Sequence, residues 1–129
     1  MLDQYKEGLK KDLLLKSNRL IQIVEDECIS ITGHPLPLIF FKKLQADMYR
    51  YQCQHQVGNN QYEKTHIKEL ALKTYKEAVA LLKMERDRRI NESKTDYIDS
   101  IRLSLNLNYA VFLYEIDNKK KKALRILKQ

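Results

Sequence analysis

The sequence contains few of the residues that interrupt helices, with only three glycines and two prolines among 129 residues, and it has no tryptophan. Leu, Lys, Glu, Ile and Gln are abundant instead, which is the composition of a helical protein. No stretch shows the alternation expected of a strand. We therefore predict an all-α protein, and the length is sufficient for one domain with its own core.

Cysteine and histidine are also scarce. The two cysteines form neither a disulfide framework nor a metal-ligand pattern, and the three histidines lack ligand spacing. No apolar run reaches the roughly 18 residues needed to span a bilayer, and the N-terminus lacks the apolar core of a signal peptide. We expect a soluble intracellular protein, located in the cytoplasm and also in the nucleus, with no metal and no cofactor.

Features of an active site are missing as well. We find no nucleophile–base pair, no glycine-rich phosphate loop and no metal-ligand cluster, so an enzyme is the least favoured class. The formal net charge of +7 at pH 7 favours acidic partners such as nucleic acid, anionic lipid or phosphorylated protein. Two basic runs carry part of this charge, at Lys119–Lys122 and at 86–89. Such runs could bind nucleic acid, but they are more often solvated helix ends.

Apolar residues recur at helical spacing along most of the chain. Gly33–Pro37 is predicted to be a linker, Gly58 a left-handed helix cap, and Ile90–Thr95 an exposed loop. One helical domain over residues 1–129 follows, with antiparallel hairpins arranged as a bundle or as stacked pairs. Its helices are predicted at about 2–29, 38–57, 60–89, 96–118 and 119–129.

The apolar positions also predict which faces of these helices are buried. The first helix has an apolar stripe, which consists of Leu2, Tyr5, Leu9, Leu13, Leu20 and Val24. The segment Asn60-x-x-Glu63 is a variant capping box that opens the third helix. The predicted buried stripe of that helix is Ile67, Leu70, Thr74, Ala78 and Leu81. The pattern is interrupted at both termini, so we expect the sequence to be incomplete at both ends.

Two helical segments carry polar groups where a helix usually buries carbon. Asn106 and Asn108 interrupt the apolar run Ile101–Ile116, and Arg50 lies between two tyrosines. An unpaired buried amide costs about 1–3 kcal/mol, so such a group must be satisfied or used. Arg50 could stack on the tyrosines, and Asn108 could form a hydrogen bond between helices. We expect Asn106 to face solvent.

These two segments resemble signatures of the 14-3-3 family. The first is FFKKLQADMYRY (Phe40–Tyr51), which resembles the family's Phe-x-x-Lys-x-x-x-Asp-x-x-Arg-Tyr segment. The second is IRLSLNLNYAVFLYEIDN (Ile101–Asn118), which is similar to Ile-Arg-Leu-x-Leu-x-Leu-Asn-x-x-Val-Phe-x-Tyr-Glu-Ile at eleven of sixteen positions. The first helix also resembles the family's fourth helix. The resemblance covers nearly the whole chain, but only about the middle half of a usual member.

The resemblance implies a non-catalytic all-α adaptor that binds phosphoserine or phosphothreonine segments. Its members are usually cup-shaped dimers, and the family is itself a standard example of phospho-motif recognition by arginine clusters. The implied partners are phosphorylated client proteins and a second subunit, as a homodimer or heterodimer. A membrane is not implied, and nucleic acid is disfavoured.

By position, the resemblance assigns phosphate binding to Lys43, Arg50 and Tyr51. Lys43 and Arg50 are seven residues apart, so both charges can lie on one helix face. The planar arginine fork suits phosphate oxygens, and a phosphate brings a charge of about −1.5 to −2 at pH 7. We expect Asp47 to orient a neighbouring cation rather than to act in acid–base chemistry.

The resemblance assigns peptide binding to Leu107, Asn108, Val111 and Glu115. Asn108 would hydrogen-bond the main chain of the peptide, and Leu107 and Val111 would form an apolar wall. Glu115 corresponds to a groove carboxylate, although it could simply pair with a nearby cation. Asn108 and Glu115 are two turns apart on the predicted helix, and Val111 lies close to the same face.

Some features depart from the family pattern. Ala46 stands where the family commonly has glycine, and the given sequence lacks the earlier helix that carries two further basic residues of the phosphate pocket. We therefore expect weaker phosphate binding than in a full member. The competing interpretation is a basic helical module that binds RNA or acidic surfaces non-specifically through the two basic runs.

Overall fold

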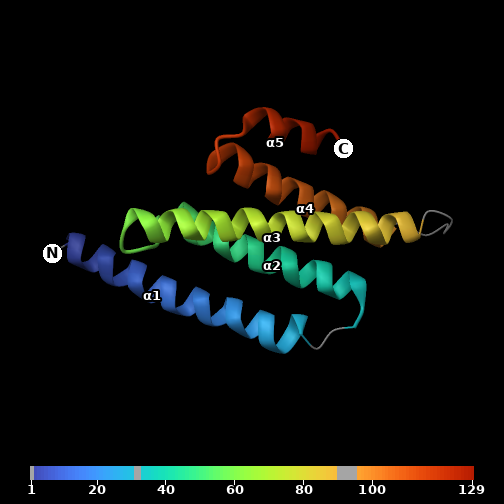
Figure 1. Ribbon diagram of the computed structural model, residues 1–129. Helices are drawn as coiled ribbons and strands as arrows, with labels where there is room; N and C mark the ends of the chain where they lie inside the picture. Colours follow the sequence, from blue (N-terminus) through green and yellow to red (C-terminus); the bar gives the residue numbers. More distant parts are fainter. Residues whose placement is uncertain (1, 31–32, 90–95) are drawn as a thin grey trace.

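The computed structural model describes residues 2–30, 33–89 and 96–129, and these ranges contain five α-helices, one π-helical turn and no strand. The predicted all-α class is therefore confirmed. Successive helices lie side by side and run in opposite directions (Figure 1). The helices are α1 (Leu2–Ile23), α2 (Pro35–Gln54), α3 (Gln61–Arg88), α4 (Asp96–Glu115) and α5 (Lys120–Leu127).

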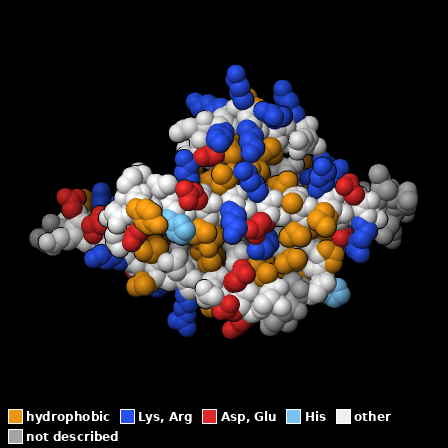
Figure 2. All heavy atoms as spheres, viewed as in Figure 1, with side chains coloured by type: hydrophobic (Ala, Val, Ile, Leu, Met, Phe, Trp, Pro, Cys, Tyr) orange, Lys and Arg blue, Asp and Glu red, His pale blue; other side chains and the backbone are white. Residues whose placement is uncertain are grey.

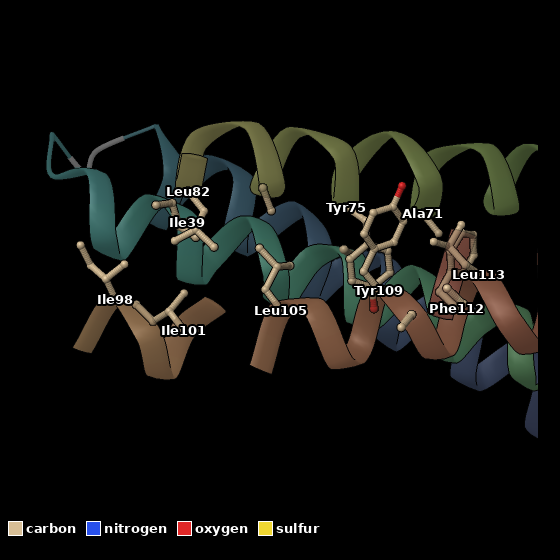
Figure 3. Packing of buried hydrophobic residues seen from close by; sticks show 14 residues of the cluster. Ile39, Ala71, Tyr75, Leu82, Ile98, Ile101, Leu105, Tyr109, Phe112 and Leu113 are labelled. Carbon is tan, nitrogen blue, oxygen red and sulfur yellow. The ribbon is translucent and has the colours of Figure 1, made fainter. Parts of the chain in front are cut away.

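The core lies where α2, α3 and α4 meet. Its fully buried members include Ile39 from α2, Tyr75 from α3, and Leu105 and Phe112 from α4 (Figure 3). Burying an aliphatic or aromatic side chain of this size stabilises the fold by about 1.5–3 kcal/mol. These contacts fix α2 and α4 against α3, and they therefore set the distance between the two helices that carry the predicted site.

Helix α2 begins at Pro35, three residues before the predicted start at Leu38. Gly33–Pro37 is thus only partly a linker. Pro35 occupies the first position of the helix, and Pro37 also lies in the first turn. Backbone N–H groups in this turn have no partner within the helix, so proline loses little there, and its fixed φ suits the helix.

The end of α2 also differs from the prediction. Gln56 adopts the left-handed conformation, with φ of 50°, and the backbone N–H of Val57 donates to the carbonyl of Gln52 at 3.0 Å. This arrangement is a Schellman-type helix end, closed by the buried Val57. Gly58 has φ of 131°, outside the left-handed helical region, so the cap predicted at Gly58 was wrong. The glycine is still needed, because that φ is strained for other residues.

The predicted capping box at the start of α3 is present in modified form. The side-chain oxygen of Asn60 accepts a hydrogen bond from the backbone N–H of Glu63 at 2.9 Å. The Glu63 carboxylate accepts from the backbone N–H of Asn59 at 2.6 Å. In the usual capping box this carboxylate would bind the N–H of the N-cap residue, Asn60, instead. Together these bonds satisfy two donors at the beginning of the helix.

Helix α1 packs against α2 largely through polar groups, and the π-helical turn Val24–Ile29 continues it. The buried Gln52 amide donates to Ser17 Oγ at 2.5 Å, and the Gln45 amide donates to the Glu25 carboxylate at 2.8 Å. Most of the predicted apolar stripe of α1 is exposed instead. This exposed set consists of Leu2, Tyr5, Leu9 and Leu20, whereas Leu13 is half-buried and Val24 is buried as predicted.

The buried face of α3 is rotated slightly from the predicted stripe. Ile67, Thr74 and Ala78 are buried as predicted, whereas Leu70 and Leu81 are only half-buried. Their neighbours Ala71, Tyr75 and Leu82 complete the buried face.

The predicted loop Ile90–Thr95 lies outside the described residues. Among the described helices, none combines the length and apolar character that crossing a membrane requires.

Glu85 is a buried carboxylate near the end of α3. Its Oε1 accepts from Arg88 Nη2 at 2.8 Å and from Arg89 Nε at 2.5 Å. The hydrogen bond from Arg88, together with that from Arg89, lowers the pKa of Glu85, although burial opposes the shift. The unfolded chain therefore binds the proton more tightly than the folded protein does, and the ionised form stabilises the fold.

We expect Glu85→Gln to lower the free energy of unfolding by about 1–3 kcal/mol at neutral pH. The contribution of Glu85 is fully present above its ordinary pKa and is lost as the pH falls through its lowered folded-state pKa. The difference between wild type and variant should therefore shrink on acidification. Urea denaturation at several pH values between about 7 and 3 measures this difference. A gap that does not depend on pH would contradict the role of the ionised carboxylate.

Candidate functional site

Asp47 is the centre of a polar cluster that joins three helices. Its Oδ2 accepts from Lys43 Nζ and from the Asn108 amide, each at 3.0 Å. Its Oδ1 accepts from the Tyr75 hydroxyl at 2.5 Å and lies 3.9 Å from Arg50 Nη2. Asp47 therefore holds two cations, one hydroxyl and one amide around a single carboxylate. We call these five residues the Asp47 cluster.

Tyr75 connects the Asp47 cluster to the core. Its hydroxyl accepts from Arg50 Nε at 3.1 Å, and its ring stacks on Tyr109 with the ring centroids 5.3 Å apart. Burial raises the pKa of Tyr75, and the nearby Asp47 carboxylate raises it further, so the phenol stays protonated and donates. The buried ring thereby fixes the position of the carboxylate, and the bond from Arg50 Nε restrains the guanidinium.

The geometry of a single helix explains why the three α2 residues of the Asp47 cluster lie together. Lys43, Asp47 and Arg50 follow one another at spacings of four and three, which places them on one face of α2. Asn108 is on α4, 61 residues beyond Asp47, and reaches the cluster only because α2 and α4 contact each other. The prediction that Asp47 orients neighbouring cations is confirmed.

The predicted phosphate-binding residues do not all belong to the cluster. The side chains of Lys43 and Arg50 are 15% and 21% exposed, so both remain partly accessible to solvent. Tyr51 is 46% exposed, and its ring centroid lies 4.3 Å from that of His55. Within the described residues, Tyr51 forms no hydrogen bond with the Asp47 cluster. Arg50 is bound to Tyr75 rather than stacked on its neighbouring tyrosines.

The predicted peptide-binding residues lie along α4 next to Asn108. Leu107 is 53% exposed, and Val111, one turn further, is half-buried. Leu103, one turn before Leu107, is also exposed, so the three side chains form an apolar strip along one face. Glu115 is exposed at the last residue of α4. Asn106, predicted to face solvent, is instead half-buried.

Aromatic and acidic neighbours engage the basic run Lys119–Lys122. Lys120 Nζ lies 5.2 Å from the Tyr114 ring centroid, and Lys122 Nζ lies 5.8 Å from that of Tyr109. Lys119 Nζ lies 3.9 Å from the Asp117 carboxylate. These contacts tie the start of α5 to α4. Figure 2 shows basic side chains spread over α5, above a hydrophobic surface nearer α3.

Comparisons with known proteins assign the chain to a family. The family model for the 14-3-3 protein matches residues 1–129. The chain belongs to the 14-3-3 family. It is 30% identical to 14-3-3 protein 9 of Solanum lycopersicum over 98% of the chain and 47% of that protein. Similarly, it is 30% identical to 14-3-3 protein zeta of Xenopus laevis, over 99% of the chain and 47% of the relative.

This 14-3-3 chain therefore spans about half the length of the curated relatives that it matches. The 14-3-3-like protein 2 of Caenorhabditis elegans gives the same result, with 28% identity over the whole chain and 47% of the relative.

In the described part of the chain, no group of three or more His, Cys, Asp or Glu side chains is arranged to hold a metal ion.

Sequence reasoning missed Tyr75 as part of the site. It lies within the apolar pattern of α3, where a tyrosine resembles any other aromatic core residue. One indication in the sequence was that a tyrosine occupies a core position, since a buried tyrosine hydroxyl usually has a hydrogen-bond partner. That rule predicts that a partner exists, but the partner's identity depends on how α2 lies against α3.

Proposed function

We propose that this 14-3-3 chain is an adaptor that binds phosphoserine or phosphothreonine segments of other proteins. The observation that carries the proposal is the Asp47 cluster, in which two cations of α2 lie beside an amide and an apolar strip of α4. A phosphate could occupy the basic side of this site, and an extended peptide could follow α4. The adaptor role of the family supports the same conclusion.

Lys43 and Arg50 would bind the phosphate. Arg50 uses Nε for Tyr75, which restrains the guanidinium plane and leaves its Nη donors for phosphate oxygens. Lys43 uses one bond for Asp47 and has further donors. The two cations face one carboxylate, so an excess of positive charge remains for a dianionic group. Tyr51 would add its hydroxyl after a change in its side-chain position.

Asn108 would bind the main chain of the peptide. One N–H of its amide donates to Asp47, which holds the side chain in place and leaves the carbonyl oxygen to accept from a peptide N–H. Leu107 and Val111 would contact peptide side chains, and Glu115 would meet polar groups further along. A preorganised amide loses less conformational entropy on binding than a free one, which favours affinity.

The proposed partners rest on the chemistry of the Asp47 cluster and on the family. We propose phosphorylated client proteins in the cytoplasm, and also in the nucleus, as ligands, and a second family subunit as a homodimer or heterodimer partner. The non-specific alternative, binding of RNA or acidic surfaces by the basic runs, is less favoured. Lys120 and Lys122 already lie over tyrosine rings, and Arg88 and Arg89 already bind Glu85.

Fluorescence anisotropy with one labelled peptide, phosphorylated or unphosphorylated on a single serine, tests the proposal. We expect the phosphorylated form to bind with micromolar affinity and the other form to bind at least about 30-fold more weakly, because charge-assisted hydrogen bonds to the phosphate are lost. Replacing Lys119–Lys122 by glutamine should change this affinity less than threefold. Equal binding of both peptides would refute the phosphate-dependent function, and a steep salt dependence removed by the glutamine variant would favour the alternative.

A further inference from the structure

A second basic site lies outside the Asp47 cluster, in a cleft between the C-terminal half of α3, the first half of α4 and Gln129, which follows α5. The cleft has a volume of about 660 Å³. Four cationic side chains line it, namely Lys83, Arg86, Arg89 and Arg102. Figure 2 shows basic side chains gathered near the C-terminal end of α3, where the adjoining parts of α4 and α5 lie.

Helix spacing brings these residues to the cleft. On α3, Val79, Lys83 and Arg86 follow at intervals of four and three, so they share one face. On α4, Ile98, Arg102 and Asn106 follow at intervals of four and share the face opposite. Asn106, which is half-buried, belongs to the lining of this cleft. Each helix contributes aliphatic and basic residues to the same space.

Two of the four cations, Arg89 and Arg102, already bind other groups of the protein and form part of the wall of the cleft. Arg89 Nε donates to the buried Glu85 carboxylate at 2.5 Å. Arg102 Nη1 donates to the main-chain oxygen of Gln129 at 2.6 Å, and its Nη2 lies 3.5 Å from the Asp99 carboxylate. The Arg102 Nε is buried without a hydrogen-bond partner among the described residues. These contacts hold both guanidinium groups at the cleft.

The other two cations, Lys83 and Arg86, differ from Arg89 and Arg102 in having no partner among the described residues. Lys83 and Arg86 are exposed, and neither forms an ion pair or a side-chain hydrogen bond within the described residues. Asp87 and Asp99 also line the cleft and Glu85 binds Arg89, so the described residues place four cations against three carboxylates. Helix-dipole stabilisation explains a cation such as Arg86 in the last turn of α3. It does not explain Lys83, which lies before that turn, or Arg102 on another helix.

We infer that this cleft binds a small anion with two linked phosphate groups. Lys83 and Arg86 would supply mobile donors, and Arg89 and Arg102 would add positive potential from the wall. The volume is typical of small-molecule sites and exceeds what a single phosphate would fill. The aliphatic side chains of Val79, Leu82 and Ile98 could contact an organic group attached to the diphosphate. The ligand could be free diphosphate or a nucleoside diphosphate.

Isothermal titration calorimetry of the whole chain with inorganic pyrophosphate, and separately with ADP, tests this inference. The decisive variant is the double substitution Lys83→Gln and Arg86→Gln, which removes both exposed donors and breaks no ion pair or side-chain hydrogen bond among the described residues. We expect it to weaken binding of both probes by about tenfold or more. The matched control is Lys11→Gln with Arg19→Gln, which removes the same charge from exposed positions on α1 that form no ion pair with any described residue. It should change affinity less than twofold.

The variant Arg50→Gln separates this cleft from the Asp47 cluster and should also change affinity less than twofold. Tighter binding of ADP than of pyrophosphate would assign the site to a nucleoside diphosphate, and the reverse order would assign it to free diphosphate. The inference is overturned if neither probe saturates, or if both double variants weaken binding equally. It is also overturned if Arg50→Gln abolishes binding while Lys83→Gln with Arg86→Gln retains it.

Discussion

Arg50→Glu is expected to abolish phosphopeptide binding, with an affinity loss of about 100-fold or more, while the helical circular dichroism stays unchanged. The substitution removes charge-assisted hydrogen bonds worth about 1.5–3 kcal/mol and places a second carboxylate beside Asp47, where it repels the phosphate. Glutamate favours helices, so α2 should persist. Anisotropy with the paired phosphorylated and unphosphorylated peptides measures the effect.

Two control variants test whether the loss of affinity comes from the position and shape of the Arg50 side chain. Arg50→Lys keeps the charge but loses the planar fork and the bond from Nε to Tyr75, so it should retain part of the affinity. Arg19→Glu makes the same charge reversal at an exposed position on α1 and should change the affinity less than threefold. If Arg19→Glu and Arg50→Glu weakened binding to the same extent, the net charge of the protein would be responsible instead of the Asp47 cluster.

Asp47→Ala is expected to lower the free energy of unfolding by about 2–4 kcal/mol. The substitution removes the acceptor shared by Tyr75, Lys43 and Asn108, and it leaves the buried Tyr75 hydroxyl without an acceptor. Loss of one partner from a partly buried charged network is costly because the remaining polar groups stay desolvated. Urea denaturation followed by circular dichroism measures the loss.

Asp12→Ala is the matched control for Asp47→Ala. Asp12 is exposed on α1 and, among the described residues, pairs only with Lys16, at 3.0 Å, so its removal should cost less than about 0.5 kcal/mol. Tyr75→Phe separates the hydroxyl from the rest of the network and should cost less than Asp47→Ala, because the ring and its stacking on Tyr109 remain. Equal stability of Asp47→Ala and Asp12→Ala would show that the Asp47 cluster does not stabilise the fold.

Stabilisation and proposed binding are coupled in the Asp47 cluster. The carboxylate of Asp47 positions the cations and the amide that would meet the ligand, but it also carries the same sign of charge as a phosphate. Asp47→Asn would keep an acceptor for Tyr75 and remove the negative charge. The variant would thus separate positioning of Lys43 and Arg50 from partial neutralisation of their charge.

Local spacing was enough to predict several features of the site. Lys43 and Arg50 share a face because they are two turns apart, and this relation holds wherever α2 packs. Asp47, one turn from Lys43, was correctly expected to orient a cation. The cap at Asn60 could be predicted because the bond from Glu63 closes within four residues. In each case, the interacting groups belong to one helix or its immediate start.

Predictions that depended on contacts between helices were less accurate. In the predicted stripe of the first helix, Leu2, Tyr5 and Leu9 are exposed, and only its C-terminal member Val24 is buried. Ser17 and Ile21, which lie outside the predicted stripe, are buried as well. In α3, the buried face is centred nearer Tyr75 than Leu70. Periodicity shows that a helix has an apolar side, but the neighbouring helix determines which part of that side is covered.

The residues and their spacing thus specified the helical class, the main helical segments and the basic face of α2, because each depends on interactions within a few turns. Only the packing of α2, α3 and α4 brought the Asn108 amide to Asp47 across 61 residues and the Tyr75 hydroxyl to the same carboxylate. The same packing set Arg102 opposite Lys83 at the second cleft. The relative rotation and separation of helices arise from many side-chain contacts at once, so no local spacing encodes them.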